Sequence, residues 1–116
     1  MREILRDGFE RLAQLFERVK PTDDPVADLA LLGREYRYNA LTSRHVFEVM
    51  FGGSNLAGFT LTAEDRYTLM PVTECTQRCM TAARFRPGDA ALVAHHMWTG
   101  VHGAVVLEIG GYFVEP

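Results

Sequence analysis

The sequence has few of the features that mark secreted, membrane or nucleic-acid-binding proteins. It has two cysteines, nothing that resembles a signal peptide, and no run near the roughly 18 apolar residues of a membrane span. A reduced, cytoplasmic setting and no membrane partner are therefore expected. The net charge is −3, with 12 basic residues scattered among 15 acidic ones. Because phosphate binding needs clustered Lys and Arg, the chain's own surface is not expected to hold nucleic acid.

Strand patterns are also missing, because no segment alternates apolar and polar residues for long enough to indicate a sheet. Apolar residues instead recur at intervals of three and four, as along residues 2–19 from Leu5 to Val19. At 116 residues we expect one all-α domain, an antiparallel bundle of about five helices. Their expected positions are residues 2–19, 26–40, 45–51, 63–85 and 90–109.

The boundaries of these helices are marked by capping residues and prolines. Asp24 before Pro25, and Asp89 after Pro87, are typical of residues that cap a new helix. Pro71 falls inside the pattern at residues 63–85, where proline removes a hydrogen bond and clashes with the preceding turn. A kink or break is therefore expected near Leu69 and Met70.

The stretch from His95 to Phe113 has helical spacing, yet Glu108 is its only charged residue. A helix without a charged face must be covered on at least two sides, by its own domain and by a partner chain. Gly103 lies inside this helix, where glycine costs about 1 kcal/mol relative to alanine. It indicates the close approach of another helix, although a glycine merely tolerated by tertiary packing is the alternative.

The candidate metal ligands have ordinary explanations. Cys75 and Cys79 lie four residues apart without a second Cys or His pair, so they are read as small buried hydrophobic residues. His95 and His102 share a helix face, but they lack the third ligand that zinc or iron requires. We expect no metal and no cofactor, and a neutral His102 that is hydrogen-bonded inside the bundle beside Trp98.

Catalytic motifs are absent as well. The sequence contains neither a G-x-S-x-G elbow nor a nucleotide-binding glycine loop, so no catalytic residue is assigned. A small helical enzyme stays open as an alternative, because bundles can place acid and base groups that no linear motif reveals. Met and aromatic residues are plentiful, and they indicate either a deformable apolar pocket or plain core.

Four stretches resemble, in order, the C-terminal domain of tetracycline-repressor-type (TetR/AcrR) transcriptional regulators. They are FERL at 9–12, DPVADLALLGREYRYNAL at 24–41, HVFEVMFG at 45–52 and RPGDAALVAHHMWTGVHGAVVLE at 86–108. The spacing W-x-x-x-H-G formed by Trp98, His102 and Gly103 is typical of the subgroup named for a W-H-G signature. Together these stretches extend from residue 9 to residue 108 of the chain.

The resemblance implies an effector-binding and dimerisation domain of a regulator, with a homodimer partner and a small hydrophobic effector. In the family a helix-turn-helix domain comes first and binds DNA, and residues 1–19 look like the helix that links the two domains. We therefore expect an excised or truncated domain that meets DNA only through that missing part. A ligand-free structural dimerisation module is the remaining alternative.

The family mechanism is a population shift, in which an effector in an apolar cavity favours one arrangement of the dimer. The resemblance implies two sets of residues. The expected cavity residues are Tyr36, Phe47, Met50, Phe51, Tyr67, Met70, Glu74, Trp98 and His102. The expected residues of the dimer interface are Val101, Val105, Glu108, Ile109 and Tyr112.

Overall fold

The computed structural model describes residues 2–45 and 68–112 of the chain. These residues form four helices and no strand, which confirms the all-α class. The helix expected at residues 45–51 lies outside them except for His45, so the count of about five compares with four in the described part. The four helices are α1 (Arg2–Glu17), α2 (Pro25–Thr42), α6 (Met70–Thr81) and α7 (Ala90–Ile109).

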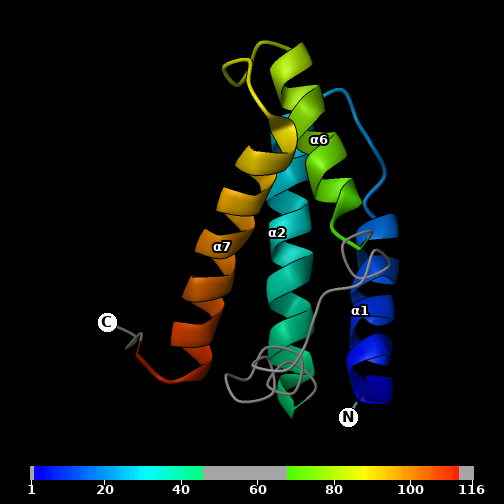
Figure 1. The fold of residues 1–116 in the computed structure, drawn as a ribbon, viewed down its shortest axis with the longest axis vertical. Helices are drawn as coiled ribbons and strands as arrows, with labels where there is room; N and C mark the ends of the chain where they lie inside the picture. The colour runs from blue at the N-terminus through cyan, green and yellow to red at the C-terminus, as the bar shows by residue number, and fades with distance from the viewer. Residues whose placement is uncertain (1, 46–67, 113–116) are drawn as a thin grey trace.

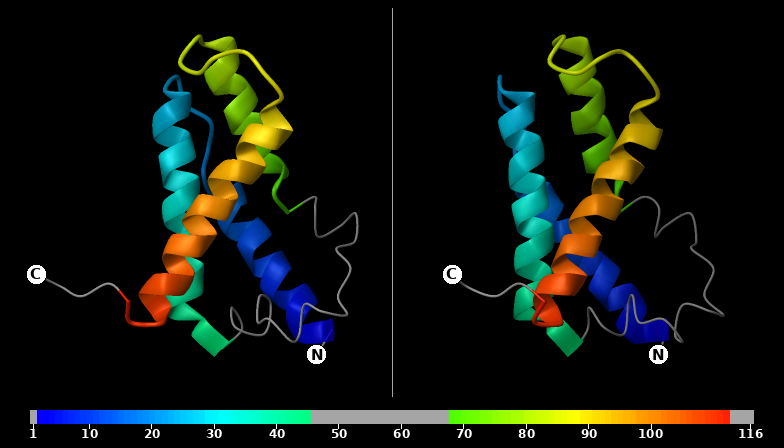
Figure 2. Two further views of the ribbon diagram at one scale, coloured as in Figure 1. Left: turned by 60° about the vertical axis from the view of Figure 1, so that its left-hand side comes forward. Right: turned by 90° about the vertical axis from the view of Figure 1, so that its left-hand side faces the viewer.

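Helix α2 lies at the centre of the described structure, with α1 on one side and α7 on the other (Figure 1). Helix α1 runs antiparallel to α2, and α6 runs antiparallel to both α2 and α7. Helices α2 and α7, by contrast, run in the same direction and are inclined to each other (Figures 1 and 2). The bundle is thus only partly antiparallel.

The expected capping residues begin α2 and α7. The Asp24 carboxylate accepts a hydrogen bond from the Ala27 amide at 3.1 Å, and Pro25 occupies the first turn. Asp89 accepts hydrogen bonds from the amides of Ala91 and Leu92 at 3.1 and 3.2 Å. These side chains satisfy amide groups that a helix start leaves without a partner within the helix.

Helix α6 is shorter than the pattern at residues 63–85 indicates. The expected break is confirmed, because α6 begins at Met70 and Pro71 occupies its first turn, where no amide hydrogen is needed. At the other end α6 stops at Thr81 instead of continuing to residue 85. Ala83 adopts a φ of 58°, and this left-handed conformation ends the helix.

The core draws on all four helices. Its buried members are Leu12, Phe16, Leu32, Tyr36, Ala40, Cys75 and Val105. Cys75 and Cys79 are free and buried, which confirms the interpretation that they are small hydrophobic residues. Burial also raises the pKa of the Cys75 thiol to about 11, so this thiol stays protonated and unreactive.

A buried carboxylate joins α2 to α6. Asp28 accepts hydrogen bonds from the Thr22 hydroxyl at 2.6 Å and the Thr22 amide at 2.8 Å. Arg78 of α6 pairs with the same carboxylate at 3.0 Å and also donates to the Thr22 carbonyl. The hydrogen bonds from Thr22 lower the pKa of Asp28 below its ordinary value of 3.8, against the opposing effect of burial.

This network predicts an acid-sensitive fold. Because folding lowers the pKa of Asp28, the stabilisation is complete above the unfolded pKa near 3.8 and is lost as pH falls through the folded value. Asp28→Asn should lower the melting temperature at pH 7, and the gap to the unmodified protein should shrink below about pH 4. Thermal unfolding followed by circular dichroism measures both.

Asp23→Asn is the matched control, because Asp23 is an exposed carboxylate in the loop that precedes α2. It should leave the melting temperature nearly unchanged at every pH. A gap for Asp28→Asn that stays constant down to low pH would contradict this account.

Candidate functional site

A large cleft opens between α2 and α7. Its volume is about 760 Å³, within the roughly 300–1,000 Å³ typical of small-molecule sites. Apart from Tyr36, Arg34, Arg37 and Glu108, the residues that line it are apolar or glycine. The lining residues are Phe16, Val26, Leu29, Ala30, Leu32, Gly33, Arg34, Tyr36, Arg37, Val72, Met97, Trp98, Gly100, Val101, Ala104, Val105 and Glu108.

Three side chains form a polar group at the inner wall of this cleft. The Tyr36 hydroxyl lies 2.6 Å from Nδ1 of His102, which joins α2 to α7 across 66 residues of sequence. The rings of Trp98 and His102 lie one helical turn apart, with centroids separated by 5.5 Å. The three side chains are therefore held in one arrangement.

The protonation states in this group follow from burial. Burial raises the pKa of Tyr36 far above its ordinary value, against a smaller effect of the hydrogen bond from Trp98, so the phenol keeps its proton. Burial likewise lowers the pKa of His102, which favours the neutral imidazole near pH 7. The Tyr36 hydroxyl and Nδ1 of this imidazole share one hydrogen bond. This is the neutral, hydrogen-bonded His102 expected from the sequence.

Charged side chains lie at the edge of the cleft. Arg37 forms a two-point ion pair with Glu108 of α7, with Nε donating to one carboxylate oxygen at 2.9 Å and Nη2 to the other. The hydrogen bond from Arg37 lowers the pKa of Glu108 and keeps it ionised. Arg34, one turn earlier on α2, also lines the cleft. The edge is thus positively charged on the α2 side.

The residues expected to line a cavity lie in different places. Tyr36 and Trp98 line the cleft, and His102 contacts Tyr36 behind it. Met70, at the start of α6, is 42% exposed and does not line the cleft. Glu74 is exposed and lines a separate cavity of about 150 Å³ with Pro71 and Arg78. The other candidates, Phe47, Met50, Phe51 and Tyr67, lie outside the described residues.

The expected interface residues do not share one surface. Val105 is only 2% exposed and belongs to the core, so it offers nothing to a second chain. Ile109 is half-buried against the same core, and Glu108 is engaged by Arg37. Val101 and Tyr112 are exposed, at 36% and 74%. Val101 also lines the cleft, so Tyr112 is the one residue of the set that is exposed away from it.

The small residues that line the cleft were not predicted from the sequence. Gly33 on α2, with Gly100 and Ala104 on α7, lines the cleft. Their helical spacing was a signal, but it did not show that the two helices face each other. Gly103 differs from expectation, because no described atom beyond its own helix lies within 4 Å of where its Cβ would be. The close approach of a helix is therefore not found among the described residues.

The described residues contain neither a cluster of metal ligands nor a membrane-spanning helix. No three His, Cys, Asp or Glu side chains among them lie close enough to hold a metal ion. None of the helices in residues 2–45 and 68–112 is long and apolar enough to cross a membrane.

Comparison with known families gives one match. The family described as "Tetracyclin repressor-like, C-terminal domain" matches residues 29–116. Neither a curated protein nor a solved structure matches the chain significantly. The match covers α6, α7 and all but the first four residues of α2, and it includes every lining residue of the cleft except Phe16 and Val26. Its description names no subgroup with a W-x-x-x-H-G signature, so that assignment stays a prediction.

The link between Tyr36 and His102 predicts a specific stability effect. Tyr36→Phe removes the hydroxyl that His102 Nδ1 contacts and leaves a partly buried nitrogen without this partner. The free energy of unfolding should fall by about 1–3 kcal/mol. Tyr38→Phe is the control, since Tyr38 is on the same helix but 60% exposed, and it should change stability by less than about 0.5 kcal/mol. Urea denaturation measures both, and equal effects would refute the proposed importance of this contact.

Proposed function

Since the chain belongs to the family of tetracyclin repressor-like C-terminal domains, we propose that it is the effector-sensing and dimerisation domain of a transcriptional regulator. The observation that carries this proposal is the apolar cleft between α2 and α7. The repressor role is taken from the description of the family. In this proposal the chain acts as a single domain in the cytoplasm, has no catalytic role, and meets DNA only through another part of the regulator.

The composition of the cleft supports a small, mainly apolar effector. A cavity of this size with apolar walls and a few polar groups is typical of sites that bury most of a ligand's surface. The polar groups are few and close together, with Tyr36 at the inner wall and Arg34 and Arg37 at the edge. Burial of apolar surface would supply the affinity, and the polar groups would orient the ligand.

The proposed mechanism is a change in how α2 and α7 sit relative to each other. A ligand that contacts both helices favours the separation at which it fits, and it can shift the population only by its difference in affinity between the two states. Helix α1 packs against α2 through Leu12 and Phe16 of the shared core. A movement of α2 would therefore reach α1, which resembles the helix that links to the DNA-binding domain in the family.

The partner we propose is a second copy of the chain that contacts the exposed side of α7. Several large apolar residues of α7 and the turn after it are open to solvent. Those that do not line the cleft are Leu92, Val106, Leu107 and Tyr112, whereas Val101 is exposed within the cleft lining. Charged residues cannot supply this contact, because Glu108 is the only one in α7 and it already pairs with Arg37. Val105 is not included, since it is buried in the core.

Filling the cleft should abolish ligand binding without unfolding the protein. A Cβ at Gly33 would have no neighbour within 4 Å, so Gly33→Leu places its side chain in open space at the cleft wall. Trp98 is the only tryptophan and lines the same cleft from α7, so its fluorescence reports on binding. In a titration with dodecanoate, the unmodified protein should show a saturable change in fluorescence that Gly33→Leu lacks.

The matched control is Gly88→Leu, at an exposed glycine in the turn before α7 that is equally unobstructed. It should bind dodecanoate as the unmodified protein does. The proposal fails if Gly33→Leu is folded by circular dichroism and binds dodecanoate with unchanged affinity.

A charge on the exposed side of α7 should weaken self-association. Leu107 is 43% exposed, and Leu107→Arg would bring two like charges into a symmetric interface. We expect the dissociation constant of the dimer to rise about tenfold or more, as measured by sedimentation velocity. Leu31→Arg on α2, at 40% exposure, is the control and should leave the dimer intact. A strictly monomeric unmodified chain at high micromolar concentration would rule out this role for α7.

A further inference from the structure

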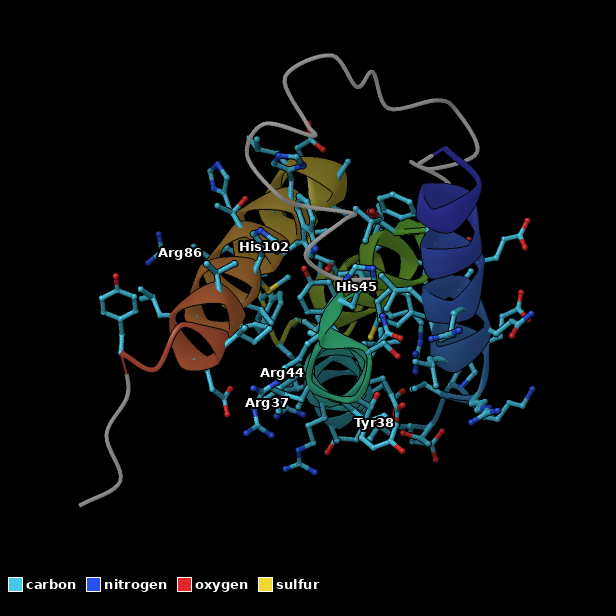
Figure 3. The ribbon with its side chains drawn as sticks, turned by 90° about the horizontal axis from the view of Figure 1, so that it is seen from below. Arg37, Tyr38, Arg44, His45, Arg86 and His102 are labelled. Carbon is cyan, nitrogen blue, oxygen red and sulfur yellow. The ribbon has the colours of Figure 1, made fainter. Side chains whose placement is uncertain are left out.

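The apolar cleft has an edge with excess positive charge. Arg34 and Arg37 line it from α2, and Glu108 is the only acidic side chain among the described residues that line it. Arg44, just past the end of α2, lies on the same side of that helix as Arg37, the side toward α7, whereas Tyr38 lies on the other side (Figure 3). The charge of Arg44 also lowers the pKa of Glu108, which places the two within electrostatic reach.

This excess charge has no counterpart among the described residues. Glu108 balances one guanidinium group, that of Arg37. Arg34 makes no hydrogen bond or ion pair with residues 2–45 or 68–112, and Arg44 makes none there either. Three guanidinium groups against one carboxylate leave two positive charges beside a cavity whose walls are otherwise apolar. An uncharged ligand would make no use of these charges, and a cationic ligand would be repelled by them.

We propose that the ligand of this cleft is an anionic amphiphile, with an apolar body between α2 and α7 and a carboxylate head group bound by Arg34 and Arg37. This inference rests on the proposed ligand-sensing function and adds the chemical class of the ligand. Arginine suits the role because its planar guanidinium group donates two parallel hydrogen bonds to a carboxylate. The two arginines are three residues apart on α2, so both reach the same side of the helix.

The head group would also compete with Glu108. Among the described residues, Arg37 and Glu108 form the only ion pair between α2 and α7. A ligand carboxylate that takes Arg37 releases Glu108, and the end of α7 then loses this connection to α2. The ligand carboxylate would therefore make a contact with Arg37 in the bound arrangement that is absent from the free one. A ligand shifts the population between two arrangements only through such a difference in contacts.

Three probes with the same apolar chain test the inference: dodecanoate, dodecanol and dodecyltrimethylammonium. Each is titrated below its aggregation concentration while Trp98 fluorescence is recorded. Dodecanoate should bind about tenfold or more tightly than dodecanol, because charge-assisted hydrogen bonds to carboxylates are worth at least that factor. The cationic probe should bind most weakly. Higher salt should weaken dodecanoate and leave dodecanol unchanged.

Variants locate the effect at the two arginines. The double variant Arg34→Gln, Arg37→Gln should reduce the affinity for dodecanoate to that for dodecanol and leave dodecanol binding intact. Arg86→Gln removes one positive charge from the loop before α7, away from the cleft lining, and should alter neither affinity.

The outcomes separate this inference from the function on which it rests. If dodecanol binds as tightly as dodecanoate and Gly33→Leu abolishes both, the cleft is a ligand site but the anionic head group is wrong. If dodecanoate binding needs the arginines but survives in Gly33→Leu, the anion binds outside the cleft and the inference is also wrong. If none of the probes binds to the folded protein, both the proposed ligand-sensing function and this inference are wrong.

Discussion

Helix α7 has twenty residues but only one charged side chain, so most of its surface must be covered by other parts of the protein. The rest of the structure depends on this requirement. Helices α2 and α6 cover only part of α7, where Ala90, Ala94 and Val105 are buried. The polar atoms that this burial brings inside require partners, and Tyr36 of α2 provides one for His102. The covered side of α7 thus faces the core and the cleft, while its other side leaves Leu107 and other large apolar residues in solvent.

The cleft and the exposed surface therefore belong to the same helix. Small residues, among them Gly33 on α2 and Ala104 on α7, leave the space between the two helices unfilled. The ion pair of Arg37 with Glu108 and the contact of Tyr36 with His102 connect the helices across this space. A ligand in the cleft acts on one side of α7, and the proposed partner chain meets the other. In the proposed function, this arrangement would couple effector binding to the arrangement of the dimer.

The helices could be predicted because their signals are local, but the site could not. Asp24 and Asp89 indicated the starts of α2 and α7, whereas the link from Arg37 to Glu108 spans 71 residues and depends on packing. Val105 was placed at the interface although it is buried, while its neighbour Val106 is exposed. An almost uncharged helix has no polar face from which its rotation can be read. The sequence therefore predicted that α7 is covered, but not which side.

The claim that an apolar ligand lies between α2 and α7 can be tested most directly by nuclear magnetic resonance. Intermolecular nuclear Overhauser effects would be recorded between dodecanoate and isotopically labelled protein. The account predicts contacts from the methylene chain to the Trp98 indole and the Val101 methyl groups, which line the cleft from α7. Contacts to exposed residues outside the cleft such as Leu31, with none to Trp98, would contradict it.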